Sequence, residues 1–217
     1  MTVITLYKIL TVIASYLFGA FPTGYIIYKA KKRGDIRKAG SGNIGGTNVT
    51  RTVGIWAGVI TIIADILKGF LPLLAVFCIF KADATLAAAV AVSAVLGHIF
   101  PVYLKFRGGK GIATSFGAIV GMCSLAFSQN VLWLRLLPIF LILFTWAIVF
   151  AASRIVSLSS LAAAVATPLS FYFSKHLLPI VIAAICLSVL TYIAHRDNII
   201  RLIKKEEKKL KGKGAKL

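Results

Sequence analysis

Seven long apolar segments, joined by shorter polar connections, dominate this 217-residue sequence. A helix that crosses a bilayer needs about 20 mostly apolar residues, within a usual range of roughly 17–25. The segments are uniformly apolar, whereas membrane β-strands alternate apolar and polar residues. We therefore predict an all-α polytopic membrane protein with seven transmembrane helices in one integral membrane domain, residues 1–217. The predicted helices are Val3–Tyr28, Val53–Phe80, Ala84–Leu104, Gly111–Phe127, Val131–Ala152, Ile155–Phe173 and Leu177–Ala194.

The composition also favours a membrane protein over a soluble one. Hydrophobic residues make up 59% of the chain and charged residues 14%, whereas roughly 25% of the residues of a soluble domain are charged. The sequence has 25 Lys and Arg against 6 Asp and Glu. In a soluble protein, such an excess would suggest binding to nucleic acid. Here most of the basic residues lie in four segments: 29–51, 105–110, Arg154 and the tail from Arg196 onward.

These four basic segments set the expected orientation. They follow the first, third, fifth and seventh predicted helices, so all four would lie on the same side of the membrane. Cytoplasmic loops of membrane proteins are enriched in Lys and Arg. We expect all four in the cytoplasm, which puts the N-terminus outside and the C-terminus inside. Residues 195–217 would form a basic cytoplasmic segment, attracted to anionic membrane lipid by about 1 kcal/mol per basic residue. Because membrane topology explains the charge, we expect no nucleic-acid partner.

The first predicted cytoplasmic loop ends in a glycine-rich segment, GSGNIGGTNVTR at residues 40–51. It is not a dinucleotide-binding fingerprint, because no strand precedes it. Glycines let the backbone approach a ligand closely, and successive N–H groups form an anion-binding concavity. A flexible interhelix connection is the alternative, but the number of hydrogen-bonding groups favours a phosphate site. The candidate residues are Gly40, Ser41, Gly42, Asn43, Gly45, Gly46, Thr47, Asn48 and Arg51.

A second glycine-rich segment, FRGGKGIAT at residues 106–114, surrounds two cations at the start of the shortest predicted helix. These cations would attract an anion, with a basic membrane-surface anchor and a tight turn as the alternative. His98, which lies shortly before this segment, fits a structural histidine slightly better than a catalytic one. The candidate residues are Arg107, Gly108, Gly109, Lys110 and Thr114.

A third polar cluster, HRDNIIRL at residues 195–202, follows the last predicted helix. If that helix continues, His195, Asn198 and Arg201 share roughly one face. They would offer an imidazole, an amide and a guanidinium to a charged substrate, and an interfacial helix end is the alternative. Ser157, beside the third basic segment, adds a hydroxyl for which helix capping is the competing explanation.

Asp65 and Lys68 lie inside the second predicted helix. Each charge costs on the order of 2.5–3.5 kcal/mol at the bilayer centre, so we expect neither to be unpaired. Their i, i+3 spacing allows an ion pair. Such a pair would be purely structural, or it would face the interior and brace the loops.

The cysteines and carboxylates suggest neither thiol nor metal chemistry. Cys78, Cys123 and Cys186 lie in apolar segments without Cys-x-x-Cys spacing, and small core or lipid-facing residues explain them. Carboxylates are few, and Mg²⁺ needs oxygen ligands. We therefore expect no metal.

Together these motifs resemble the bacterial acyl-phosphate:glycerol-3-phosphate acyltransferase family. The resemblance covers essentially the whole chain. The family usually carries a glycine after the last motif and a glutamate two residues later; here Lys205 takes the place of the glycine and Glu207 that of the glutamate. The matching motifs are Asp35-Ile36-Arg37 before GSGNIGGTNVTR, Asp65-x-x-Lys68-Gly69, GHIFPVYLKFRGGKGIAT and HRDNIIRL.

The resemblance implies an enzyme of the bacterial inner membrane with its active site on the cytoplasmic face. It would transfer a fatty acyl group from a long-chain acyl phosphate to the 1-hydroxyl of glycerol 3-phosphate, giving lysophosphatidic acid and inorganic phosphate. Acyl phosphate is already an activated anhydride. We therefore expect no covalent acyl-enzyme and no cofactor, but catalysis by positioning and electrostatics.

The chemistry of this reaction suggests how the candidate residues share the work. Ser41, Arg51, Lys110 and Asn198 would hold glycerol 3-phosphate. The first glycine-rich loop and Ser157 would hold the acyl phosphate. His195 is either a general base or an orienting donor. The remaining candidates, Arg107, Gly108, Gly109, Thr114, Arg201 and Glu207, are expected to support substrate binding in a monomeric enzyme.

A phosphate-ester transporter would use similar cations. It would bind its substrate near the midplane of the membrane, between broken and repeated spans. The sequence has no internal repeat, and its polar clusters lie at one interface. A purely structural membrane protein would leave the glycine-lined cation clusters unexplained. Both alternatives are therefore less favoured than the enzyme.

Overall fold

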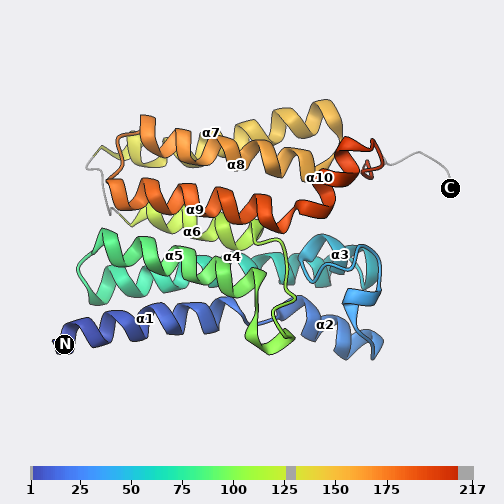
Figure 1. Ribbon diagram of the computed structural model, residues 1–217, viewed down its shortest axis with the longest axis horizontal. Coiled ribbons are helices and arrows are strands. Elements are labelled where there is room, and N and C mark those ends of the chain that lie inside the picture. The colour runs from blue at the N-terminus through green and yellow to red at the C-terminus, as the bar shows by residue number, and fades with distance from the viewer. Residues whose placement is uncertain (1, 126–130, 210–217) are drawn as a thin grey trace.

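The computed structural model describes residues 2–125 and 131–209, and all regular elements in these ranges are helices (Figure 1). The predicted all-α class is therefore confirmed. The last residues of the fourth predicted helix, up to Phe127, and residues 210–217 of the basic tail lie outside the described ranges. The α-helices are α1 (Val3–Gly19), α2 (Thr23–Lys32), α3 (Gly46–Thr52), α4 (Ile55–Ile79), α5 (Ala84–Ile99), α6 (Ile112–Ser124), α7 (Leu132–Ser153), α8 (Val156–Phe173), α9 (Leu178–Ala194) and α10 (Arg196–Ile203).

Five apolar helical segments of the described chain are long enough to cross a membrane. A sixth is possible if α9 and α10, which meet at an angle of 62°, count as one span. Helix α6 has 13 residues, which cover only about 20 Å of a hydrocarbon core that is about 30 Å thick. The long segments are Val3–Lys32, Ile55–Ile79, Ala84–Leu104, Leu132–Ser153 and Val156–Phe173.

The first span is not the continuous helix that the sequence suggested. It breaks between α1 and α2 at Ala20–Pro22 and then continues to Lys32. Proline has no N–H to donate and disfavours the helical conformation of the residue before it. Pro22 therefore accounts for the break.

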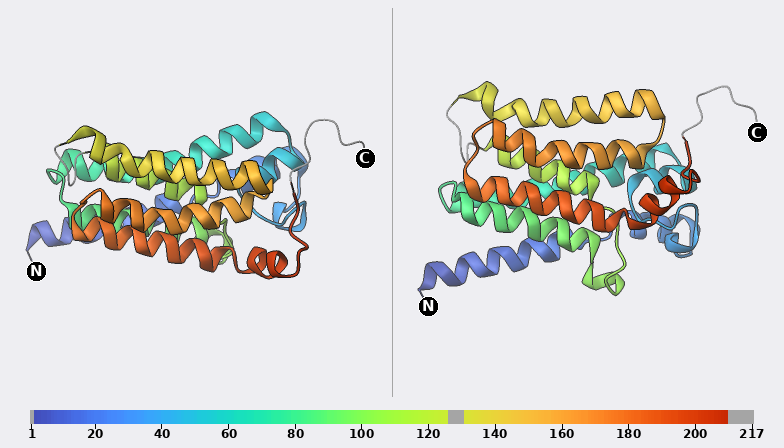
Figure 2. Two further views of the ribbon diagram at one scale, coloured as in Figure 1. Left: turned by 90° about the horizontal axis from the view of Figure 1, so that it is seen from above. Right: turned by 45° about the horizontal axis from the view of Figure 1, so that its top comes forward.

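Helix α5 lies inside the bundle, in contact with α1, α4, α6 and α9. Glycines bring several helices close together: a Cβ atom at Gly69 would collide with the Thr114 carbonyl of α6, and one at Gly97 would collide with the Tyr16 carbonyl of α1. Small residues of this kind let membrane helices approach. Helix α7 lies at the edge of the bundle (Figure 2) and exposes large apolar side chains such as Phe140, as expected for a helix facing lipid.

The polar segments gather at one end of the bundle. Helices α2, α3 and α10 lie at the end opposite the N-terminus, and the views in Figures 1 and 2 agree on this. The first and third predicted polar clusters, which flank these helices, therefore lie on the same side of the molecule.

Candidate active site

The first glycine-rich loop is held together by the side chain of Asn48. Its Oδ1 accepts a hydrogen bond from the Ser41 N–H at 2.9 Å, and its Nδ2 donates to the carbonyl oxygens of Ala39 at 3.0 Å and Asn43 at 2.8 Å. Both amide hydrogens are therefore used inside the loop. Gly40 has a φ of +61°, and a Cβ atom there would collide with Asn48 Oδ1. In this structure Asn48 shapes the loop from a buried position.

Helix α3 begins directly after a turn in which Asn43 Oδ1 accepts a hydrogen bond from the Gly45 N–H at 2.7 Å. Gly46 is buried against α4, because a Cβ atom there would collide with Ile62. The side chains of Ser41, Thr47 and Arg51 remain exposed. These exposed groups are the members of the loop that a substrate could reach, together with its backbone. Gly42 (φ +73°) and Gly45 line the same loop.

The second glycine-rich loop folds back onto the end of α5. The N–H groups of Gly108 and Gly109 donate to the carbonyl oxygens of Ile99 at 3.1 Å and His98 at 3.0 Å. Of the two candidates at its ends, Arg107 is exposed, whereas Thr114 is fully buried against α4. The structure therefore places Thr114 in a helix–helix contact, away from the exposed polar groups.

The segments that lead into the two loops are fastened to each other. Arg37 donates from its guanidinium to the Leu104 carbonyl at 3.2 Å, and it also forms an ion pair with Asp35 at 2.7 Å. Below this contact, Leu104 packs with apolar residues of the first loop, among them Ile44. The two glycine-rich loops thus form one structural unit, through contacts between residues far apart in the chain.

Glu207 joins the third cluster to the start of α8. Its Oε1 accepts from Asn198 Nδ2 at 2.6 Å and from Ser157 Oγ at 2.8 Å, and its Oε2 accepts from Arg201 Nε at 2.6 Å. Burial alone would raise the pKa of this carboxyl, but the three donors hold the pKa below its usual range. Glu207 is therefore ionised at neutral pH.

Lys110 links all three clusters electrostatically. Burial lowers the pKa of its ammonium group; Glu207 opposes this shift, while the positive charges of Arg201 and Arg51 lower the pKa further. Such effects require the groups to lie near one another. The structure thus brings Arg51 of α3, Lys110 of the second loop and the C-terminal cluster into one neighbourhood.

His195 lies at the bend between α9 and α10 and is only 2% exposed. The helix therefore bends at this residue. The prediction that His195 and Asn198 share one face of a continuous helix is wrong. His195 Nδ1 is 2.8 Å from the Thr191 carbonyl oxygen, which can only accept, so Nδ1 carries the proton. Burial, with help from the charge of Lys110, lowers the pKa of the imidazole to about 4. The ring is neutral at physiological pH, with an unprotonated Nε2.

A family profile described as Glycerol-3-phosphate acyltransferase matches residues 9–205. The chain belongs to the glycerol-3-phosphate acyltransferase family. Curated members include proteins from Endomicrobium trichonymphae, 42% identical over 95% of this chain and 97% of the relative, and from Geobacillus kaustophilus, 39% identical over 94% and 97%. This membership confirms the resemblance and favours a membrane acyltransferase over a phosphate-ester transporter.

Two solved structures of an acyltransferase of this family have the same fold. Both are crystal structures of PlsY (YgiH), an integral membrane glycerol 3-phosphate acyltransferase. The glycerol 3-phosphate form is 33% identical, with a TM-score of 0.83 over 94% of this chain and 96% of that one. The lysophosphatidic acid form is 32% identical, with a TM-score of 0.80 over the same shares. An integral membrane fold is therefore shown for this chain.

The structure explains why the family usually has a glycine after the last motif, at the position that Lys205 occupies in this chain. Lys205, at that position, adopts a φ of +58°. Its N–H donates to the Leu202 carbonyl at 3.0 Å and the Glu206 N–H to the Arg201 carbonyl at 2.8 Å, which is the Schellman pattern that ends many helices. Glycine is favoured in this conformation. The turn reverses the chain after α10 and brings Glu207 back onto it.

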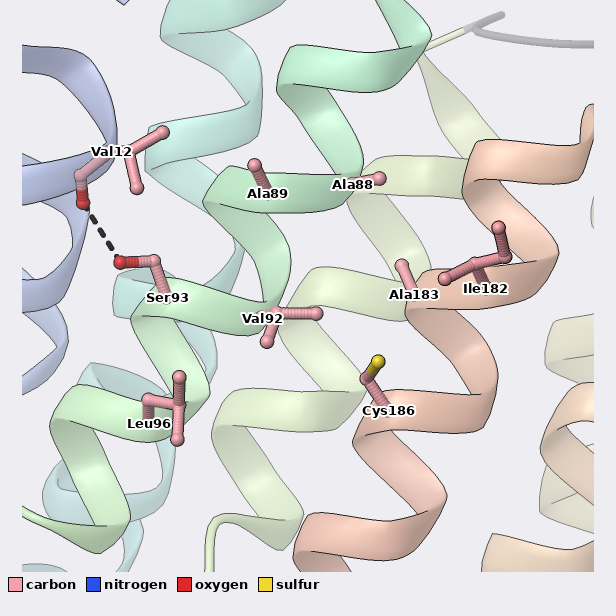
Figure 3. A pocket seen from close by; sticks show the side chains of 9 residues that line it. All are labelled: Val12, Ala88, Ala89, Val92, Ser93, Leu96, Ile182, Ala183 and Cys186. Atoms are coloured by element: carbon pink, nitrogen blue, oxygen red, sulfur yellow. Dashed lines mark hydrogen bonds between the residues drawn. The ribbon is translucent and has the colours of Figure 1, made fainter. Parts of the chain in front are cut away.

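In the part of the chain that the structure describes, neither the apolar groove of the bundle nor a metal-binding cluster contributes to the candidate site. An apolar groove of about 320 Å³ between α1, α5 and α9 contains none of the candidate residues, and its Ser93 hydroxyl already donates to the Val12 carbonyl (Figure 3). Such a groove suits hydrocarbon rather than phosphate. Among the described residues, no group of three or more His, Cys, Asp or Glu side chains is arranged to hold a metal ion.

Proposed function

We propose that this family member transfers a fatty acyl group from a long-chain acyl phosphate to the 1-hydroxyl of glycerol 3-phosphate. The products are lysophosphatidic acid and inorganic phosphate. The observation that carries this proposal is the meeting of three separate cationic segments, through Arg51, Lys110 and Arg201, in one neighbourhood. Two phosphorylated substrates that must approach each other need this concentration of positive charge. The solved relatives in glycerol 3-phosphate and lysophosphatidic acid forms support it.

The candidate groups, of which Ser41, Thr47 and Arg51 are exposed while Asn198 and Ser157 are buried, divide between the two substrates. Ser41, Arg51, Lys110 and Asn198 hold glycerol 3-phosphate, and Asn198 retains its carbonyl oxygen for this purpose while its amide donates to Glu207. The backbone of the first loop, with Thr47 and Ser157, holds the acyl phosphate. Arg107 completes the rim, whereas the N–H groups of Gly108 and Gly109 are already bonded to the end of α5 and position Arg107 and Lys110. The leaving group is phosphate, so the acyl group passes directly between substrates without a covalent acyl-enzyme or a cofactor.

His195 orients the reacting hydroxyl in this proposal. Its neutral Nε2 accepts a hydrogen bond from the 1-hydroxyl, because Nδ1 is held by Thr191. A base whose conjugate acid has a pKa of about 4 is poorly matched to full proton removal near neutral pH. The imidazole therefore does not keep the proton: as the ester forms, the proton passes from the hydrogen bond with Nε2 to the departing phosphate oxygen. Atoms and charges balance: the ester C–O bond forms, the acyl–phosphate bond breaks and the hydroxyl proton leaves with the phosphate.

The site lies on the cytoplasmic face of a multi-pass inner-membrane protein. Seven spans, with α1–α2 as the first and the short α6 as the fourth, put the N-terminus outside and the C-terminus inside. The clustering of basic residues at the end of the bundle that carries α2, α3 and α10 supports this orientation. The chain works as a single-domain monomer, since each cluster comes from the same chain, and its basic tail contacts anionic lipid.

Phosphate release from purified protein in detergent tests this function. Acyl phosphate plus glycerol 3-phosphate should release phosphate and form lysophosphatidic acid without added metal or cofactor, and omission of either substrate should stop acyl transfer. Arg51→Ala should lower kcat/KM about 10²-fold, as for a lost transition-state donor, whereas the exposed Arg196→Ala provides a matched control with normal rates. No lysophosphatidic acid across several acyl-chain lengths would contradict the proposal.

A further inference from the structure

A buried ion pair lies in the membrane part of the bundle, away from the exposed cations. Lys68 Nζ is 2.8 Å from Asp65 Oδ1, and both side chains are 4% exposed. The predicted pairing is therefore present. A buried pair is weak evidence of a stabilising role, because well-packed apolar residues often replace one at little or no cost. Charged residues inside a membrane usually have a functional role. The groups that contact this pair indicate what that role is.

Lys68 is connected to the first glycine-rich loop through the start of α2. Its ammonium also donates to the Phe21 carbonyl at 2.7 Å, at the break where α1 ends and α2 begins. Helix α2 in turn lies against the loop, because a Cβ atom at Gly24 would collide with the Ile44 carbonyl. Lys68 therefore fixes the start of the helix that supports and leads into the first loop.

Asp65 faces the second glycine-rich loop through His98. Asp65 Oδ1 lies 3.7 Å from His98 Nδ1, and the imidazole is likewise 4% exposed. On its other side, the His98 ring occupies the place where a Cβ atom of Gly109 would be, and its backbone carbonyl accepts from the Gly109 N–H. The orientation of this ring thus sets the position of the residue just before Lys110.

We propose that Asp65, Lys68 and His98 are positioning residues that set the distance between the two glycine-rich loops. On one side, Lys68 joins the α1–α2 break to α4 through the Phe21 carbonyl; on the other, Asp65 of α4 lies against the buried His98 ring at the end of α5. This inference rests on the proposed site, in which the loops hold phosphates that must meet. A displacement of about 1 Å in such an arrangement can lower the rate about 10²-fold.

The test removes the charges but keeps the packing. In Asp65→Leu/Lys68→Met, the thermal unfolding midpoint should fall only modestly, because both charges are replaced together and only the hydrogen bond to the Phe21 carbonyl is lost. The KM for glycerol 3-phosphate should nevertheless rise and kcat should fall, lowering kcat/KM about 10²-fold. The matched control is Lys8→Met/Asp83→Asn, which removes the 2.6 Å ion pair at the other end of the bundle. Its kinetics should be normal.

Hydrogen exchange gives a second readout that does not require substrate. Backbone amides of residues 40–46 and 107–111 should exchange faster in the Asp65→Leu/Lys68→Met variant and at the wild-type rate in the control. If the double variant fails to fold, Asp65→Asn/Lys68→Gln, which removes both charges but keeps an acceptor and a donor, is measured in its place, and kcat/KM and hydrogen exchange should change in the same directions. Wild-type kinetics and exchange in the folded variant would overturn the inference. If the proposed function itself were wrong, the wild type would also be inactive in the acyl-transfer assay.

Discussion

Glu207 accepts a hydrogen bond of 2.6 Å from the Asn198 amide, although the end of α10 separates the two residues. The same carboxylate binds Arg201 and Ser157, and so ties the segment after α10 to α8. Asn198 cannot turn away from the site while this contact exists. The orientation of one proposed substrate-binding residue thus depends on a residue that follows the last helix.

Glu207→Gln should destabilise the protein in a pH-dependent way. A hydrogen bond to a charged group contributes about 2 kcal/mol, and the pKa of Glu207 is lower in the folded state than in the unfolded state. The stabilisation is therefore present above the unfolded pKa, near 4.3, and is lost as the pH falls through the folded pKa. Thermal unfolding midpoints between neutral and acidic pH should show a wild-type advantage that disappears at the acidic end. Glu206→Gln, at the exposed neighbour, should match the wild type throughout.

Lys205→Gly should stabilise the turn after α10. A non-glycine residue in the left-handed conformation costs roughly 1–2 kcal/mol, and Lys205 has a φ of +58°. We expect a higher unfolding midpoint with unchanged or higher activity. The adjacent Lys204→Gly is the matched control: Lys204 has a φ of −78°, so glycine there brings no relief and should be neutral or destabilising. Equal effects of the two substitutions would contradict this explanation.

Asn48→Ala and Ser41→Ala should separate loop structure from substrate binding. The Asn48 side chain makes three hydrogen bonds inside the loop, each contributing about 1 kcal/mol. Its loss should lower both the unfolding midpoint and kcat/KM. Ser41 is exposed, so Ser41→Ala should lower kcat/KM with little change in stability. Equal stability of the two variants would show that Asn48 does not hold the loop.

The sequence predicted the helical class and the three polar clusters because apolar length and charge are local properties of the chain. It predicted an unbroken first helix, since the apolar run continues through Pro22. It also predicted that Asn48 binds substrate, whereas the Asn48 side chain is used inside the loop. Hydrogen bonds such as Arg37 to the Leu104 carbonyl join residues far apart in the chain. Which polar groups face a substrate and which face one another depends on such contacts, and only the folded structure shows them.

In the pH profile of kcat/KM, Lys110 should cause an alkaline limb, a decline at high pH, that begins at a lower pH than for an ordinary lysine. Burial lowers the pKa of this ammonium below the usual value of about 10.4. Below that pKa the group is charged and attracts phosphate, and above it the charge is lost, so kcat/KM should fall as the pH rises through it. Lys110→Arg should retain measurable activity and move the limb upward, because arginine stays protonated above pH 12. Lys110→Met should be about 10²-fold slower and should lack the limb. An alkaline limb of kcat/KM that is identical in the wild type and in Lys110→Arg would show that another group titrates there.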